Sequence, residues 1–268
     1  MMNPGAYIEN VREFKPLVHH ITNYVTVNDC ANACLAIGAS PVMADAVDEA
    51  ADMAKISNAL VLNIGTLQVG KVESMMVAGR MANALEIPVV FDPVGCGATP
   101  FRNQMARELM NKIHMTVVRG NISEIFSLGG EAVHTKGVDA GQADEKEALS
   151  IAQMLAKKWK TVVVISGGTD IVTDGNHTAY IKNGCPEMSA ITGSGCMCTT
   201  LIGAFCGANQ KNPFESAVAA MTAMGIAGEK AWKAYGEKGL GHFHMGLIDE
   251  LGKMDSATLE KEGKYEIL

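Results

Sequence analysis

The chain has 268 residues, of which 48% are hydrophobic and 19% charged, and this balance excludes an intrinsically disordered protein. Its 22 basic and 29 acidic residues give a net charge of −7, so it lacks the basic surface expected of a nucleic-acid or anionic-membrane binder. No apolar run approaches the roughly 20 residues that span a bilayer, and the first residues lack the pattern of a secretory signal, so we expect a cytoplasmic protein with no membrane partner.

Four apolar runs rich in β-branched residues are predicted to form buried strands, with helical patterns before, between and after them. The expected strands cover residues 59–64, 88–91, 115–118 and 161–165. The expected helices cover residues 26–38, 70–86, 100–113, 121–128 and 144–158. Because the apolar character of the runs is continuous rather than alternating, we expect a largely parallel central sheet with helices on both faces. The alternation of strands and helices therefore predicts the α/β class.

A hairpin and a helical region follow these elements. Residues 171–173 and 178–181 are predicted to pair as strands, because they flank the turn sequence Asp-Gly-Asn. Three more helices are expected, over 195–207, 214–234 and 246–253, and the second is so rich in Ala, Met and Gly that it should pack inside the body of the protein. No linker, charge block or repeat divides the chain, so we expect one domain spanning residues 1–268.

One segment between a strand and a helix imitates a nucleotide-binding loop. Gly65 to Val72 matches the P-loop pattern G-x-x-x-x-G-K-[ST] except at its last position, where Val72 lacks the hydroxyl that ligates Mg²⁺. We therefore interpret the segment as an ordinary turn from strand to helix, with Lys71 in solvent.

A glycine-rich loop before a small-residue helix is a stronger candidate for phosphate binding. Residues 192–196 read Thr-Gly-Ser-Gly-Cys. The two glycines, Gly193 and Gly195, let the backbone curl and expose consecutive N–H groups, and a helix N-terminus adds unpaired donors and partial positive charge. These donors favour binding of a phosphate or of a transition state that carries phosphate charge. A plain tight turn is the alternative.

Cys196 stands at the first turn of that helix. The helix dipole should lower the pKa of its thiol and favour the thiolate, whereas the alternative is a small apolar side chain that fills space. The loop does not fit a dinucleotide fingerprint, because Cys198 stands where the third glycine would be and the loop lies late in the chain.

Charged and hydroxyl side chains follow three of the predicted strands. The carboxyl ends of parallel strands face the ligand crevice, so Asp92, Arg119 and Ser166 should lie at one edge of the sheet. Arg119 suits a phosphate, and Asp92 with Glu124 suits Mg²⁺, bound directly or through water. The alternative for Glu124 is structural, since Asn121 and Glu124 are spaced as a capping box of the next helix.

Taken together, these residues resemble the ribokinase-like superfamily and, within it, the hydroxyethylthiazole kinase family. The resemblance covers essentially the whole chain and rests on six segments in order: residues 20–25 (His-Ile-Thr-Asn-Tyr-Val), 38–43, 62–67, 92–97, 119–124 and 192–196. It implies a three-layer fold and ATP- and Mg²⁺-dependent phosphorylation of the hydroxyl of 4-methyl-5-(2-hydroxyethyl)thiazole, which supplies thiamine phosphate biosynthesis and salvage. It also implies a homotrimer with active sites at subunit interfaces.

The resemblance further implies roles for individual residues. The anion hole is expected to consist of Gly193, Ser194, Gly195 and Cys196, with Cys196 nearest the transferring phosphoryl group. By similarity, Arg119 and Ser166 contact ATP, and Asp92 and Glu124 hold Mg²⁺. Asn23, Met43 and Gly193 are expected to contact the thiazole, the first two from a neighbouring subunit or near the interface.

Two departures separate this chain from its wider superfamily and its family. Most ribokinase-like kinases have Asp where this chain has Cys196, whereas thiazole kinases have Cys there, as this chain does. Ser166 stands where the family is expected to have Thr. The alternatives are a pyrimidine or pyridoxal kinase or a repair dehydratase on the same fold, or a non-catalytic protein that binds nucleotide or thiazole. The complete set of candidate residues argues against a protein that has lost its activity.

Overall fold

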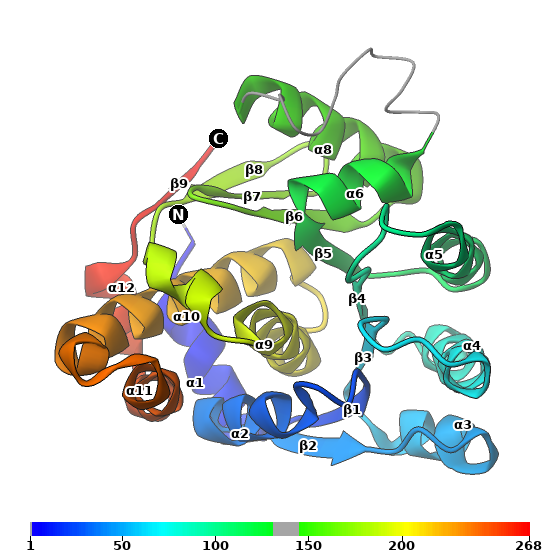
Figure 1. Cartoon of the computed structure of the whole chain (residues 1–268), viewed down its shortest axis with the longest axis horizontal. Coiled ribbons are helices and arrows are strands. Elements are labelled where there is room, and N and C mark those ends of the chain that lie inside the picture. The colour runs from blue at the N-terminus through cyan, green and yellow to red at the C-terminus, as the bar shows by residue number, and fades with distance from the viewer. Residues whose placement is uncertain (1, 131–144) are drawn as a thin grey trace.

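A computed structural model describes residues 2–130 and 145–268. A nine-stranded sheet runs through it in the order β2-β1-β3-β4-β5-β6-β7-β8-β9 (Figure 1). The first six strands are parallel and the last three antiparallel. The strands are β1 (Leu17–Ile21), β2 (Ser40–Met43), β3 (Ala59–Asn63), β4 (Val89–Asp92), β5 (Val117–Asn121), β6 (Val162–Ser166), β7 (Asp170–Thr173), β8 (Thr178–Ile181) and β9 (Tyr265–Ile267).

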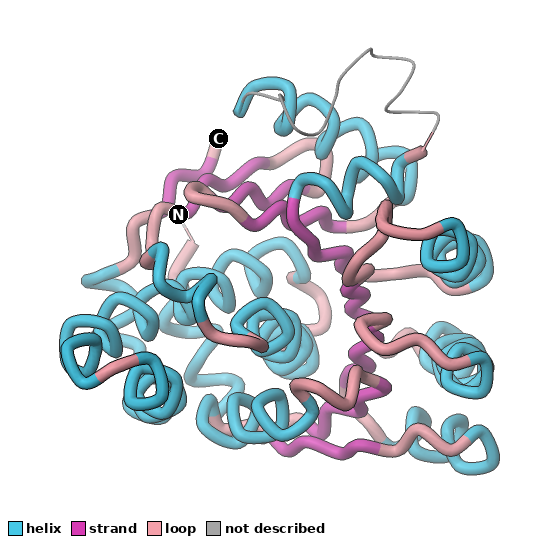
Figure 2. The backbone as a smooth tube through the Cα atoms, viewed as in Figure 1, coloured by secondary structure: helices cyan, strands magenta, loops and turns pink. Residues whose placement is uncertain are grey.

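Helices cover both faces of the sheet, which makes three layers (Figures 1 and 2). One face carries α3 (Val47–Ile56), α4 (Val69–Ala84), α5 (Pro100–Lys112), α6 (Ile122–Gly129) and α8 (Glu145–Trp159). The other carries α1 (Pro4–Phe14), α2 (Val27–Ile37), α9 (Ser194–Ala208), α10 (Pro213–Tyr235), α11 (Leu240–Lys253) and α12 (Ser256–Glu262), with short 3-10 turns at Pro186–Ala190 and Gly236–Lys238. The predicted three-layer fold is confirmed.

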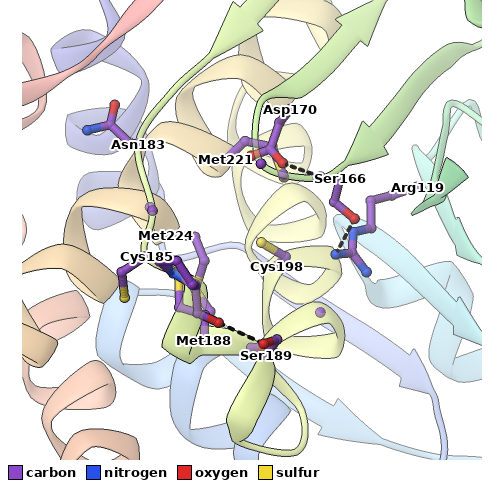
Figure 3. Close-up of a pocket in the computed structure, with 17 residues that line it drawn as sticks. Arg119, Ser166, Asp170, Asn183, Cys185, Met188, Ser189, Cys198, Met221 and Met224 are labelled. Carbon is purple, nitrogen blue, oxygen red and sulfur yellow. Dashed lines mark hydrogen bonds between the residues drawn. The ribbon is translucent and has the colours of Figure 1, made fainter. Parts of the chain in front are cut away.

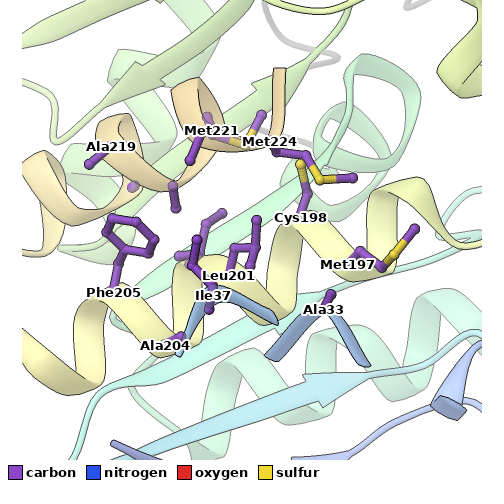
Figure 4. Packing of buried hydrophobic residues seen from close by; sticks show 14 of the residues in the cluster. Ala33, Ile37, Met197, Cys198, Leu201, Ala204, Phe205, Ala219, Met221 and Met224 are labelled. Atoms are coloured by element: carbon purple, nitrogen blue, oxygen red, sulfur yellow. The ribbon is translucent and has the colours of Figure 1, made fainter. Parts of the chain in front are cut away.

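Two hydrophobic cores lie on opposite faces of the sheet, because successive side chains of each strand point to opposite sides. Val61 and Val90 belong to the core beneath α9 and α10, whereas Leu62 and Phe91, their neighbours in the chain, belong to the other. Figure 4 shows the first core, where Leu201 and Phe205 of α9 pack against small and flexible side chains of α10 and α2. The burial of nearly all of α10 from Phe214 to Gly228 confirms that this helix runs inside the body.

The central elements agree with the sequence prediction, and the outer ones were missed. The four predicted strands, the hairpin and the eight predicted helices all occur, with shifted ends; residue 144, where one predicted helix starts, lies outside the described residues. The missed elements are β1, β2, β9, α1, α3 and α12. Among the missed strands, β1 contains two histidines, β2 contains a proline, and β9 has only three residues. Their apolar patterns are therefore weak.

None of the helices in the described residues is both long enough and apolar enough to cross a bilayer.

Candidate active site

The carboxyl ends of four parallel strands bring the candidate residues to one edge of the sheet. Asn63 ends β3 and pairs in register with Asp92 at the end of β4. Arg119 lies on β5, and Asn121, which ends that strand, pairs with Ser166 at the end of β6. Because the strands are parallel and adjacent, residues from distant parts of the chain meet here, as predicted for Asp92, Arg119 and Ser166.

The start of α9 lies over this edge without a capping side chain. Gly193 is the N-cap residue and has a φ of 95°, a left-handed conformation that favours glycine. A Cβ atom on Gly195 would lie 2.7 Å from Nη1 of Arg119, so glycine at this position lets the guanidinium approach the first turn of the helix. The partial positive charge of the first-turn amides and the charge of the guanidinium therefore lie together, which favours binding of an anion.

Arg119 is held by the sheet edge beneath it. Its side chain is 12% exposed, its Nη1 lies 3.8 Å from Oδ2 of Asp92, and its Nη2 donates a hydrogen bond of 2.9 Å to Oγ of Ser166. The charged group is therefore fixed in direction before any anion arrives, which lowers the entropic cost of binding.

Asp92 is the most deeply buried carboxylate of the site, at 0% exposed. Its Oδ2 accepts hydrogen bonds from Thr199 (2.7 Å) and Asn63 (3.2 Å), but its Oδ1 has no partner among the described residues. Burial raises the pKa of Asp92 to about 6. An inward-facing carboxylate oxygen without a partner suits a divalent cation, so the residues here fit Mg²⁺.

Glu124 forms the predicted capping box and lies at the same edge. Its Oε2 accepts from the amide of Asn121 (2.9 Å), and the side chain of Asn121 accepts from the amide of Glu124 (2.9 Å). Its Oε1 accepts from the amide of Gly95 (2.8 Å), which ties the α6 start to the loop after β4. A carboxylate oxygen has further lone pairs, so the structural role of Glu124 is compatible with metal binding.

Cys196 lies in the first turn of α9 with its thiol facing the asparagines of the site. Its Sγ accepts hydrogen bonds of 3.3 Å from Nδ2 of both Asn23 and Asn63. Burial, and next the charge of Asp92, raise the pKa of Cys196 above its ordinary value. The prediction of a lowered pKa is therefore wrong, because desolvation of the sulfur and a nearby buried carboxylate outweigh the stabilising donors.

A cavity of about 480 Å³ opens beside the start of α9 (Figure 3). Arg119 and Ser166 lie on one side, Met188 and Met224 lie across from them, and a third methionine, Met221, lies beside Asp170. The methionines come from the segment after β8 and from α10, so no local sequence signal pointed to them. The size and polarity of the cavity suit a nucleotide with its phosphates on the side of Arg119 and Ser166.

Asp170 is another residue of the cavity that the sequence prediction missed. It lines the cavity, and its Oδ1 accepts from the amide of Gly167 (2.9 Å), which shapes the turn after Ser166. Burial raises the pKa of Asp170 to about 6. The sequence prediction singled out Ser166 at this strand end but did not include Asp170.

Of the three residues expected to contact the thiazole, Gly193 lies at the start of α9, whereas Asn23 and Met43 are placed apart from each other. Asn23 is 3% exposed and sits beside Cys196, with its amide engaged inside the chain. Met43 is half-buried at the carboxyl end of β2, the outermost strand, and β1 separates it from β3. Met43 therefore lies at the side of the molecule rather than in the cluster around Cys196.

The segment that imitates a P-loop is a turn into α4, as predicted. Lys71, however, is not in solvent: its side chain is 12% exposed, donates 2.8 Å to the carbonyl of Thr22 and pairs with Asp45 at 3.3 Å. The prediction of a solvated lysine is wrong, because the ammonium group ties α4 to the loop after β1.

Comparisons with known proteins agree with this geometry over the full chain. A model of the hydroxyethylthiazole kinase family matches residues 8–257. The chain is 50% identical to hydroxyethylthiazole kinase of Clostridium beijerinckii, over 98% of this chain and 96% of that protein. It is 49% identical to the enzyme of the same name from Alkaliphilus oremlandii, over 97% and 96%.

Solved structures give the same result. Hydroxyethylthiazole kinase from Pyrococcus horikoshii OT3 superposes with a TM-score of 0.91 and 38% identity, and 100% of both chains is covered. An ADP complex of pyridoxal kinase from Bacillus subtilis superposes with a TM-score of 0.59 at 14% identity, over 79% of this chain and 91% of that chain, which supports a shared fold alone. The chain belongs to the hydroxyethylthiazole kinase family.

Proposed function

We propose that this chain is a kinase that transfers the terminal phosphoryl group of ATP to the hydroxyl of 4-methyl-5-(2-hydroxyethyl)thiazole, in the biosynthesis and salvage of thiamine phosphate. The observation that carries the proposal is the start of α9, where uncapped amides, Arg119 and Cys196 converge in a chain with close relatives of that name. The reaction is expected in the cytoplasm, where ATP is available and thiols such as those of this chain stay reduced.

ATP is expected to bind with its phosphates at the start of α9 and its base beside the methionines of the cavity. Arg119 and Ser166 contact the phosphates, and the amides of residues 193–196 face the group in transfer. Phosphoryl transfer leaves little covalent chemistry to the protein, so these donors act by positioning the group and stabilising its charge.

Mg²⁺ is expected at the carboxylates of Asp92 and Glu124, where it would supply charge neutralisation for the phosphates. The buried Oδ1 of Asp92, which has no partner among the described residues, supports this assignment. Thr199 and Asn63 orient the same carboxylate from the other side.

The thiazole alcohol is expected beside Cys196 and Gly193, with Asn23 behind the thiol and Met43 supplied by a neighbouring subunit of a homotrimer. Two apolar side chains next to this place, Tyr24 and Val25, are 67% and 59% exposed, which is unusual beside a polar site and suits a subunit contact. Cys196 then orients the hydroxyl or takes its proton late in the transfer.

A coupled ATP assay tests the proposal. The protein should phosphorylate the thiazole alcohol with Mg²⁺ present, and changing Gly195 to Leu should lower kcat/KM by at least about 100-fold, because the side chain displaces Arg119 from the helix start. The matched control is Gly168→Ala in the same cavity, where an added Cβ meets nothing within 4 Å and the activity should be kept.

The substrate panel separates the alternatives. Phosphorylation of the hydroxymethylpyrimidine alcohol or of pyridoxal, but not of the thiazole alcohol, would assign the chain to another kinase on this fold. Binding of ATP without turnover of any alcohol would support a non-catalytic binding protein.

A further inference from the structure

Asn63 lies at the centre of the site, where its side chain is held by hydrogen bonds within the chain. It is 1% exposed, at the last residue of β3, and pairs in register with Asp92. Its Nδ2 lies 3.2 Å from Oδ2 of Asp92 and 3.3 Å from Sγ of Cys196. One amide group therefore contacts both the carboxylate expected to hold the metal and the thiol expected beside the alcohol.

The orientation of this amide is fixed by the backbone. The N–H of Gly65 donates to Oδ1 of Asn63 at 2.9 Å, and a main-chain N–H is a donor in any assignment of the side chain. Oδ1 must therefore face Gly65, and Nδ2 must face Asp92 and Cys196. A Cβ on Gly65 would lie 3.0 Å from this Oδ1, so the glycine also provides room for the contact.

Asn23 is oriented in the same way. Its Oδ1 accepts from the amides of Val25 (3.1 Å) and Thr26 (3.0 Å), so its Nδ2 faces Oδ1 of Asn63 (3.0 Å) and the sulfur of Cys196 (3.3 Å). Backbone amides thus direct two N–H donors at one sulfur atom, which holds Cys196 as a hydrogen-bond acceptor.

We propose that Asn63 is a positioning residue whose amide holds the Cys196 thiol and the Asp92 carboxylate in one fixed arrangement. The inference rests on the proposed kinase function for its catalytic meaning, but the arrangement itself is a property of the free protein. Asn63 needs no contact with ATP or alcohol, because it acts through the two groups that it orients.

Site-specific alkylation tests the arrangement without any substrate. Iodoacetamide modification is followed residue by residue by mass spectrometry in wild type, Asn63→Asp and Asn63→Leu, both of which lack the Nδ2 donors. Alkylation of Cys196 should slow by about tenfold in both variants, because the thiolate loses a donor. Cys185 is an internal control: it is half-buried, bonds to the carbonyl of Gly228 and should react at an unchanged rate.

Thr199→Val is the matched control variant. It removes the 2.7 Å bond to Asp92 but leaves both donors to Cys196, so alkylation of Cys196 should stay within about twofold of wild type. In steady-state assays the Asn63 variants should lose at least about tenfold in kcat, with KM for the alcohol changed by less than about threefold, since a positioning residue acts on the reacting geometry.

Unchanged Cys196 alkylation and unchanged kcat in folded Asn63 variants would overturn the proposal. Failure of both variants to fold would also overturn it, because Asn63 would then be a structural residue. Wild-type protein that turns over no thiazole alcohol would refute the proposed function instead, while the alkylation result would still decide the role of Asn63 in the arrangement.

Discussion

At the scale of single residues, we expect the amides around Cys196 to contribute more to catalysis than its thiol does. The surroundings of Cys196 raise its pKa, so the side chain is mostly a protonated thiol at neutral pH and is a poor general base. In a loose transition state the alcohol loses its proton late, and positioning and charge stabilisation supply the larger effect. Changing Cys196 to Ala should therefore lower kcat by about 10²- to 10⁴-fold at most and leave measurable activity in the coupled ATP assay.

Cys34→Ala is the control for this prediction, because it removes a buried thiol from α2 outside the loop. Its kcat should match that of wild type. Complete loss of activity in Cys196→Ala, with normal binding of ATP and thiazole, would contradict the ranking and make the thiol the dominant group.

His20 on β1 should make the folded protein sensitive to acid. Burial lowers the pKa of His20 from 6.5 to about 4, because the side chain is 1% exposed. As the pH falls through this range, the unfolded chain binds a proton that the folded chain does not, so stability present above pH 6.5 is lost towards pH 4. Urea unfolding at several pH values should show this loss in wild type and a smaller one in His20→Leu.

His177→Gln is the control, because His177 is exposed and its hydrogen bond to Asp174 raises its pKa, the opposite direction. That variant should keep the acid sensitivity of wild type. If His20→Leu lost stability over the same pH range as steeply as wild type, the buried neutral histidine would not be the cause.

At the scale of elements, the start of α6 joins a helix cap to the expected metal site. Changing Asn121 to Ala removes the bond to the amide of Glu124 and should cost about 1 kcal/mol of stability. The capping box that holds Glu124 then keeps only one of its two hydrogen bonds. The Mg²⁺ concentration for half-maximal activity should therefore also rise. Chemical unfolding and Mg²⁺ titrations of activity measure the two effects.

The start of α5 offers a matched cap at a different place. Thr99 accepts from the amide of Arg102 at 3.2 Å, so Thr99→Ala should lose a similar amount of stability without changing the Mg²⁺ requirement. An equal rise in the Mg²⁺ requirement in both variants would mean that general loosening, rather than Glu124, causes it.

At the scale of the whole molecule, the proposed trimer should allow two different inactive variants to restore activity when they assemble together. Met43 is expected to serve a neighbour's site, whereas Gly195 serves its own. Co-expression of Met43→Glu with Gly195→Leu should restore roughly a quarter of the sites, because each site draws one part from each of two subunits. The mass of the assembly and the activity of the purified mixture are measured together.

Separately purified and unmixed variants are the control, and each should be nearly inactive. A trimer whose mixed form stays inactive would place Met43 in its own subunit's site, and a monomeric wild type would refute the assembly itself.

Local patterns in the chain were sufficient for the central fold and for most of the candidate site. Continuous apolar runs predict buried strands, and their carboxyl ends predict that Asp92, Arg119 and Ser166 share an edge, which the register confirms. The hairpin β7–β8 and the capping box of α6 follow from short-range turn and cap chemistry. Each of these rests on interactions between residues close in sequence or on one geometric rule of parallel sheets.

The C-terminal tail shows where such patterns end. No element was predicted there, yet β9 extends the sheet beyond β8, and the amide of Lys264 donates to the side chain of Asn183 in the wall of the cavity beside α9. The short segment from Lys264 to Leu268 has no local pattern that predicts its hydrogen bond to a residue 81 positions earlier in the chain.

By itself, the sequence determined the α/β layering, the helix start at residues 193–196 and the set of charged groups at the sheet edge, because periodicity, glycine pattern and strand ends are local properties. Only the tertiary structure decided the raised pKa of Cys196, the burial of Lys71 and the central place of Asn63. Those properties depend on desolvation and on donors from other elements, which come together only when the chain has folded.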